Sequence, residues 1–173
     1  SHYSLGGTTV LKGYCGRLLY VDLTDGKISE ASLPEDTASK FLGGVGIAAR
    51  LLWDLVPEEL DPFSADNVLV IMTGPFVGSP VPSSPKYTIS TISPLTGLYS
   101  YSQASGEFGS DLKGAGYDGV VIMGRAPAPR YLVIREGRAQ LKDAEFLWGM
   151  PSSQALSFVK DELNAPCSVL TVG

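Results

Sequence analysis

Two short apolar runs that each end in glycine constrain the fold most, because both follow the same series of local patterns. VLVIMTG occupies 68–74 and SVLTVG occupies 168–173. Each run comes after two strand-like segments around a tight turn and after a helix-like segment that opens with proline. Apolar runs of this length, bounded by turn residues, are typical of buried strands. The pattern predicts an α+β fold built from two similar hairpin–helix–strand repeats, about 14–75 and 128–173; coincidental similarity between short hairpins is the alternative.

The segments before these runs have recognisable starts and stops. Strand-like residues around tight turns predict hairpins over 17–33 and 130–144. A proline followed by two acidic residues marks a helix start at 34–36, and a pair of glycines ends that helix. A second helix over 47–56 places its leucines on one face, and a third begins at 151.

Length and charge restrict the class of protein and its partners. The 173 residues are enough for one domain with a real core, or for two small ones. Eighteen acidic and thirteen basic residues give a net charge of −5, which argues against a nucleic acid or an anionic membrane as partner. No apolar run approaches the roughly 20 residues of a membrane-spanning helix. The N-terminus lacks a signal-peptide pattern; residues 1–12 are expected to be a disordered tail or a cloning remnant, and 13–173 the domain.

Two short motifs resemble known sites but have simpler explanations. GGVGIAA at 43–49 has the G-x-G-x-x-A spacing of a dinucleotide site, but it follows a helix instead of a strand, which favours an inter-helix turn. SSPK at 83–86 has the S-x-x-K spacing of a serine acyltransferase, but its proline disfavours the helix that this chemistry requires. The better interpretation is a loop that ends at Lys86, the first residue of a strand. There the lysine either neutralises an anion or is a solvated charge.

The chain has few groups that could bind a metal ion. It contains one histidine, at position 2, and two distant cysteines, Cys15 and Cys167. Zinc needs about four nitrogen or sulfur ligands and iron–sulfur clusters need several thiolates, so neither site can be assembled here. The cysteines are therefore expected to be small core residues, and their number suits a reducing cytoplasm.

The segment 93–126 contains the most plausible binding loop. Its residues 102–109, SQASGEFG, precede a helix start and then a strand. Glycine lets backbone N–H groups approach a phosphate closely, and a helix start offers unpaired N–H donors. The simpler alternative is a tight strand-to-helix turn with an N-cap from Ser102 or Ser105, and the two interpretations are compatible.

Several ordered motifs together resemble one known family. They are SPLTG (93–97), SGEFG (105–109), LKGAGYDGVVIMGRA (112–126), GYCGRLLYVDLTDGKI (13–28) and FLGGVGIAARLLWD (41–54). In this order and spacing they are similar to the N-terminal domain of the tungsten-containing aldehyde:ferredoxin oxidoreductases. The resemblance runs from about residue 13 to the last residue.

The resemblance implies a cofactor-cradling domain of a larger enzyme. Members of the family hold tungsten, or molybdenum, in a bis-pterin cofactor, with a magnesium ion between the pterin phosphates. They oxidise aldehydes to carboxylic acids and pass electrons through a 4Fe-4S cluster to ferredoxin. The cluster ligands and acid–base residues lie in later helical domains, so this chain is expected to be truncated at its C-terminal end, inactive alone and without catalytic residues of its own. A homo-oligomer is left open, and a non-catalytic scaffold or assembly module is the alternative.

The family's cofactor contacts can be transferred to five positions, Lys86, Gln103, Ala104, Ser105 and Gly106. Lys86 stands where the family often has an arginine that reaches the cofactor. Gln103 stands where an asparagine's backbone carbonyl helps to hold the magnesium. Ser105 and Gly106 stand where a glycine pair lies against the pterin. Lysine in place of arginine loses the bidentate fork, and Ser105 adds a side chain where close approach is expected.

Overall fold

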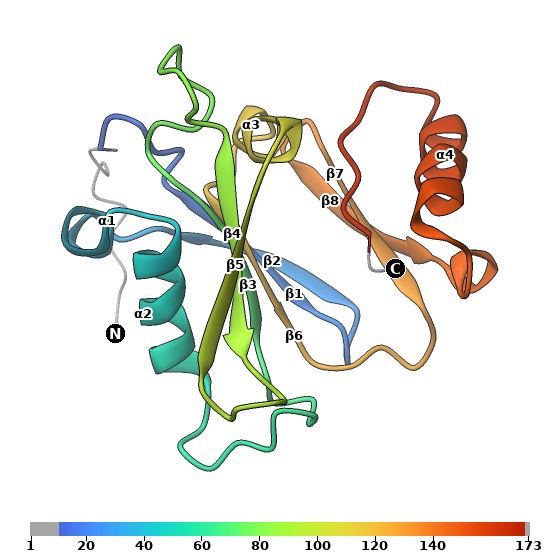
Figure 1. The fold of residues 1–173 in the computed structure, drawn as a ribbon, viewed down its shortest axis with the longest axis horizontal. Helices are drawn as coiled ribbons and strands as arrows, with labels where there is room; N and C mark the ends of the chain where they lie inside the picture. The colour runs from blue at the N-terminus through green and yellow to red at the C-terminus, as the bar shows by residue number, and fades with distance from the viewer. Residues whose placement is uncertain (1–10, 172–173) are drawn as a thin grey trace.

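A computed structural model describes residues 11–171, which form a mixed α+β domain (Figure 1). One six-stranded sheet has the strand order β2-β1-β6-β3-β4-β5, and β7 and β8 form a separate two-stranded sheet. The strands are β1 (Arg17–Asp22), β2 (Lys27–Ser32), β3 (Leu69–Thr73), β4 (Lys86–Ile92), β5 (Tyr99–Ser105), β6 (Gly119–Met123), β7 (Arg130–Arg135) and β8 (Arg138–Asp143). The helices are α1 (Glu35–Phe41), α2 (Val45–Leu55), α3 (Glu107–Gly114), the 3-10 turn η1 (Glu145–Leu147) and α4 (Ser152–Leu163).

Strand β6 lies in the middle of the large sheet although it comes late in the chain. It pairs in parallel with β1 and antiparallel with β3, while the β1–β2, β3–β4 and β4–β5 pairs are antiparallel. Apolar side chains alternate along the central strands, so each face of the sheet has its own core. On β1, Leu18 belongs to one cluster, and Leu19 and Val21 belong to the other.

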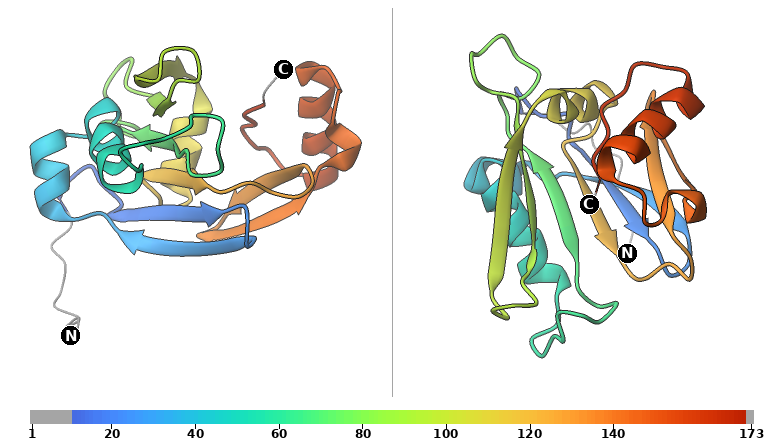
Figure 2. Two further views of the ribbon diagram at one scale, coloured as in Figure 1. Left: turned by 90° about the horizontal axis from the view of Figure 1, so that it is seen from below. Right: turned by 45° about the vertical axis from the view of Figure 1, so that its right-hand side comes forward.

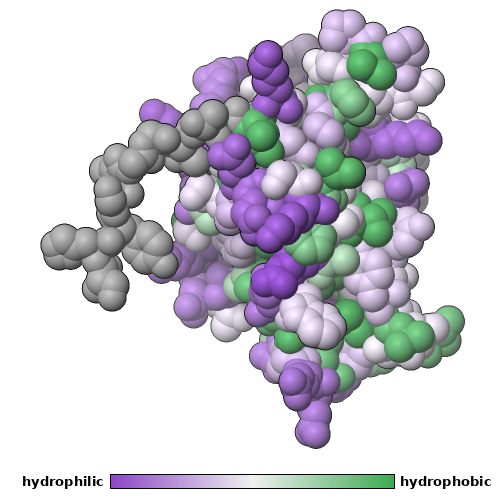
Figure 3. Space-filling view, turned by 90° about the vertical axis from the view of Figure 1, so that its left-hand side faces the viewer, coloured by the Kyte–Doolittle hydropathy of each residue, from purple (hydrophilic) through white to green (hydrophobic). Residues whose placement is uncertain are grey.

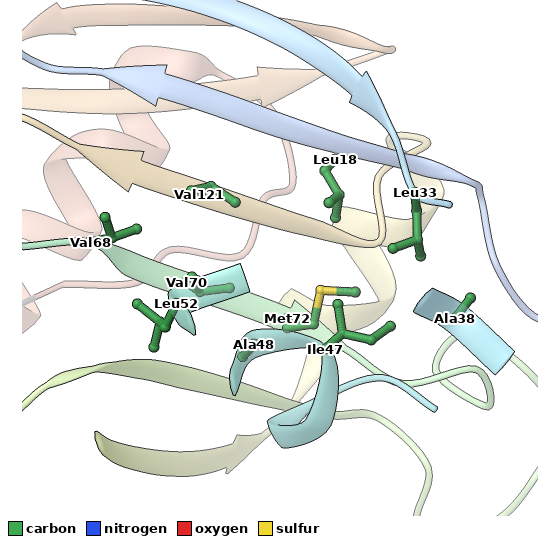
Figure 4. Close-up of a cluster of buried hydrophobic side chains, with 10 residues drawn as sticks. All are labelled: Leu18, Leu33, Ala38, Ile47, Ala48, Leu52, Val68, Val70, Met72 and Val121. Atoms are coloured by element: carbon green, nitrogen blue, oxygen red, sulfur yellow. The ribbon is translucent and has the colours of Figure 1, made fainter. Parts of the chain in front are cut away.

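Helices cover one face of the sheet, and a hairpin with a short helix covers the other. Figure 4 shows Leu18, Val70 and Met72 of the sheet beside Ile47 and Leu52 of α2. The opposite cluster combines residues of β1, β3 and β6 with Leu112 of α3, and apolar residues of β7 and β8 pack against it. Figure 2 shows α1 and α2 at one end of the molecule and α4 at the other.

The structure confirms the local patterns but not the complete repeat. Both hairpins, both early helices, the helix after residue 151 and the buried strand β3 are present. The expected second strand is wrong over its described part, because 168–171 forms no strand. Strand β3 is held by β4 and β6, which both follow it in sequence, and 168–171 has no such partners in the described chain. The expected tail at 1–12 lies mostly outside the described residues, as do 172–173.

The glycine-rich segment 43–49 is an inter-helix turn, as its position after a helix predicts. Leu42 ends α1 in the left-handed conformation with φ 60°, and Gly44 precedes α2. The N–H of Gly44 donates to the carbonyl of Thr73 at 2.9 Å. A Cβ on Gly43, whose φ is 108°, would lie 3.0 Å from that same oxygen. Close packing on the end of β3 therefore explains the glycines without a nucleotide.

The outer surface of the α1–α2 side is mixed in character. In Figure 3 its apolar side chains form small groups separated by polar ones. Trp53 on α2 is 82% exposed, next to the ion pair between Arg50 and Asp54. Within 11–171, no helix combines the length and apolar character needed to cross a membrane.

Candidate functional site

The predicted cofactor residues meet where β4 begins and β5 ends. Lys86 is the first residue of β4, and Ser105, its cross-strand partner, is the last residue of β5. Gln103 lies opposite Thr88 in the same ladder. Directly opposed residues share a face of a sheet, as do residues two apart, so Lys86, Gln103 and Ser105 lie on one face. Ala104, opposite Tyr87, lies on the other face.

The segment 102–109 is a strand and a helix joined by one residue, which corrects the expected loop. Strand β5 continues to Ser105, and α3 begins at Glu107. Gly106 alone makes the connection, with φ 125° and ψ −167°, and no side chain caps the helix. The expected caps from Ser102 or Ser105 are therefore wrong. Serine, glutamine and alanine have little strand propensity, and pairing with β4 determines their conformation here.

The backbone around Gly106 is open to a ligand. Every residue of β5 is exposed, and so are Lys86 and Glu107. Apart from its own chain neighbours, no heavy atom of residues 11–171 lies within 4 Å of the position that a Cβ on Gly106 would occupy. A phosphate could therefore approach the N-terminus of α3 without displacing other parts of the described chain.

Two opposite charges border this opening. Lys86 supplies a positive charge, and the N-terminus of α3 favours an anion. Glu107, in the first turn of α3, supplies a negative charge that opposes a bare phosphate. Carbonyl and carboxylate oxygens are the ligands that magnesium prefers. The mixture suits a phosphate accompanied by a divalent cation, so the residues present fit the group that the family resemblance implies.

Helix α3 is held at both ends, which fixes the opening at its start. Near the N-terminal end, the ring of Phe108 packs on Tyr87 with centroids 5.0 Å apart. At the C-terminal end, the ammonium of Lys113 lies 3.2 Å from the carboxylate of Asp118 and also donates to the carbonyl of Gly13. This arrangement makes α3 a rigid border of the candidate site.

Asp118 is a structural residue that the sequence motifs did not reveal. Its side chain is 1% exposed and accepts hydrogen bonds from the N–H groups of Cys15 at 2.9 Å and Gly16 at 2.7 Å. Its carbonyl accepts from both the N–H and the hydroxyl of Thr73. The sequence shows it as an acidic residue of the motif at 112–126, directly before the apolar run GVVIM.

The two cysteines are half-buried free thiols. Burial, and then the Asp118 carboxylate, raises the pKa of the Cys15 thiol, while Lys113 and Arg17 act in the opposite direction. A protonated thiol is a poor metal ligand. Across residues 11–171, no three histidine, cysteine or acidic side chains group closely enough to hold a metal ion.

Comparison with known proteins adds the family context. Residues 18–173 match the family model for the N-terminal domain of aldehyde ferredoxin oxidoreductase. The chain is 38% identical over 151 residues to the tungsten-containing aldehyde ferredoxin oxidoreductase of Pyrococcus abyssi, an alignment that covers 87% of this chain and 25% of the relative. It is 41% identical over 140 residues to the WOR-like subunit of an aliphatic sulfonate oxidoreductase of Pyrococcus furiosus, covering 79% of this chain and 22% of the relative.

A solved structure shares the fold. The active site complex BamBC of benzoyl coenzyme A reductase, in complex with 1,5-dienoyl-CoA, superimposes with a TM-score of 0.87 at 35% identity. The match covers 90% of this chain and 24% of that one. The chain thus spans about a quarter of the length of the curated relatives it matches. These matches show that the chain belongs to the aldehyde ferredoxin oxidoreductase family and corresponds to the N-terminal domain of its members.

Proposed function

We propose that this chain is the tungstopterin-cradling part of an aldehyde:ferredoxin oxidoreductase-like enzyme. One observation carries the proposal: Lys86 lies directly across from Ser105, beside the open Gly106 backbone and the start of α3. This juxtaposition occurs in a domain of a family whose relatives are named as tungsten-containing.

Each candidate residue has a distinct role in holding the cofactor. Lys86 pairs with a pterin phosphate, and the exposed backbone from Gln103 to Gly106 forms the ledge on which that phosphate rests. The backbone carbonyl of Gln103 would supply a ligand to magnesium, and Ala104, paired with Tyr87, would hold the ledge in register with β4. The bound tungsten, or molybdenum, supplies the oxygen-transfer and two-electron chemistry.

The remainder of the catalytic machinery belongs to the part of the parent enzyme beyond this domain. A 4Fe-4S cluster held there would supply electron transfer to ferredoxin, and the helical domains there would carry the aldehyde pocket. The domain alone has no catalytic activity under this proposal. This division of roles is supported by the coverage of the relatives, since the chain aligns with only about a quarter of the length of each.

Removal of the lysine charge in the full-length protein tests the proposal. Lys86→Ala removes one charge-assisted contact of about 1.5–3 kcal/mol, which corresponds to about tenfold or more weaker cofactor retention. We expect the tungsten and pterin content of the purified protein to fall together. Lys27→Ala is the matched control, since Lys27 is also an exposed lysine at the first position of a strand. Equal cofactor content in both variants would exclude Lys86 as a cofactor residue.

The same preparations separate the enzyme from the scaffold alternative. Ser105 in the ledge and Glu107 beside it are the features that favour a non-catalytic relative, because Ser105 adds a side chain and Glu107 opposes a phosphate that lacks a divalent cation. If the unmodified full-length protein, purified without oxygen, contains neither tungsten, molybdenum nor pterin, the domain is a scaffold. Stoichiometric metal and pterin identify the enzyme.

A further inference from the structure

Strand β5 is an edge of the large sheet that nothing in the described chain covers. It pairs with β4 alone, and all seven of its residues are exposed. Figure 2 (right) shows it as the outermost strand of its hairpin. We call β5 together with the preceding turn, 93–98, the β5 surface. A free strand edge exposes a row of N–H and C=O groups that can pair with another chain.

Strand β5 lacks the devices that normally protect such an edge. No charged residue occurs between Lys86 and Glu107, and the strand itself, YSYSQAS, contains no proline. Its pairing with β4 runs without a bulge from Lys86–Ser105 to Ile92–Tyr99. Charges, prolines and bulges are the usual means by which stable proteins prevent pairing at an edge.

The opposite edge of the same sheet provides an internal comparison. Strand β2 is also a largely exposed edge strand, but it carries Lys27 and Glu30. Glu30 is further engaged by the guanidinium of Arg17 at 3.4 Å. The β2 edge is therefore protected by charged side chains, as expected of an edge that faces solvent. The β5 edge has no such charges, as expected of an edge that another part of the protein covers.

The side chains of the β5 surface also suit a permanent contact. Tyr99 and Tyr101 lie on one face with ring centroids 6.2 Å apart, and Tyr101 is 53% exposed. Leu95 and Leu98 in the adjoining turn are 92% and 68% exposed. The other face carries the small residues Ser100, Ser102 and Ala104, which allow close approach of a neighbouring backbone. Tyrosine and leucine groups of this kind are typical of buried interfaces.

We propose that the β5 surface is an intramolecular docking surface, covered in the full-length protein by the part of the same polypeptide that lies beyond this domain. An uncharged edge left open is an aggregation hazard, and a partner on the same polypeptide covers it without a separate binding event. About three quarters of the length of the matched relatives lies outside this domain, which supplies such a partner. Covering β5 also closes the side of the cofactor ledge at Gln103–Ser105; this consequence rests on the proposed function.

Hydrogen exchange on the full-length protein tests the proposal without requiring bound metal. We expect amides of Tyr99–Ser105 to exchange at least about tenfold more slowly than those of the exposed edge Lys27–Ser32, and independently of protein concentration. Exchange of β5 as fast as that of β2 would overturn the proposal. Protection that increases with protein concentration would also overturn it, because a second copy would then be the partner.

A matched pair of substitutions gives a second measurement. Ser102→Lys and Ser29→Lys each place a lysine in the middle of an edge strand, β5 and β2 respectively. We expect Ser102→Lys to lower the Tm of the full-length protein by several degrees and to accelerate exchange in Tyr99–Ser105, while Ser29→Lys changes neither. Equal Tm values in the two variants would show that the β5 surface is open. Lys86→Ala tests cofactor retention, whereas Ser102→Lys tests the docking surface. The proposed function and the proposed docking surface can therefore fail independently of each other.

Discussion

At the scale of single residues, Asp118 connects three parts of the fold that lie far apart in the sequence. Its carboxylate joins the start of β1, through the N–H groups of Cys15 and Gly16, to the end of α3, through Lys113. Its main chain joins β1 to β3, because its N–H donates to Arg17 and its carbonyl accepts from Thr73. The candidate site lies at this same end of the sheet, so one buried carboxylate aligns the elements that border it.

Replacement of Asp118 by asparagine is expected to be strongly destabilising. The variant leaves the Lys113 ammonium, whose side chain is 9% exposed, without its anionic partner. Breaking a buried pair in this way costs about 3–5 kcal/mol in the free energy of unfolding. The control is Asp36→Asn, which breaks the exposed pair with Lys40 and should cost no more than about 0.5 kcal/mol. Chemical denaturation of the full-length variants measures both, and similar losses would contradict the role assigned to Asp118.

Gly106 could be required for two reasons: its backbone conformation, and the space that it leaves for a ligand. Its φ of 125° lies in a region that other residues rarely adopt, while the space around its missing Cβ is open. A substitution there would strain the strand-to-helix connection even without a ligand. Lys86, which has ordinary strand geometry, is therefore the cleaner position for testing cofactor binding.

At the scale of elements, turn and capping residues made the hairpins and helices predictable from the sequence. The strands that depend on pairing with distant segments were not predictable in this way. The tight turns and the proline–acid signature correctly located β1–β2, β7–β8 and α1. The end of β5 was missed because its polar residues become a strand only through pairing with β4. The local sequence of 168–171 predicts a strand, but a strand forms only when it pairs with another one. The partners of β3 are β4 and β6, which both follow it in the chain, and 168–171 has no such partner within residues 11–171.

The structure places the predicted cofactor residues side by side, and their binding of a cofactor stays a prediction. The family motifs placed Lys86 and Gln103–Gly106 at one site, and the structure brings them together across one ladder. The support from Asp118 depends on tertiary contacts that short motifs do not encode.

Helix α4 is joined to β8 by an ion pair whose contribution should depend on pH. Glu162 lies 3.1 Å from Lys142, and the nearby Tyr131 hydroxyl, followed by Lys142, lowers the pKa of Glu162. A lowered folded-state pKa gives stability that is present above the unfolded-state pKa and lost as pH falls through the folded value. We expect Glu162→Gln to lower the Tm at neutral pH, and the difference from wild type to vanish in acid. A difference that stays constant with pH would exclude this ion pair as its cause.

At the scale of the whole molecule, the proposed function assigns structural support and redox chemistry to different parts of the parent enzyme. The described domain offers backbone, one lysine and a helix start to a ligand, but only two half-buried cysteines, Cys15 and Cys167, as thiol ligands. Iron–sulfur clusters require several thiolates, usually four. Under the proposed function, the thiolates of such a cluster therefore come from residues outside this domain.

Expression of the 173-residue chain alongside its full-length parent tests this division. We expect the parent, purified without oxygen, to contain tungsten or molybdenum together with iron, and to oxidise aldehydes. The 173-residue chain should contain less than about one tenth of an iron or tungsten atom per molecule, because it cannot complete a cluster or enclose the pterin. Circular dichroism has to show the expected mixture of helix and strand, so that a loss of folding is not mistaken for a loss of ligands. Because the β5 surface would be uncovered in this chain, Ser102→Lys should raise its solubility without changing its metal content. Stoichiometric iron or tungsten in the folded 173-residue chain would show that the metal chemistry resides in this domain after all.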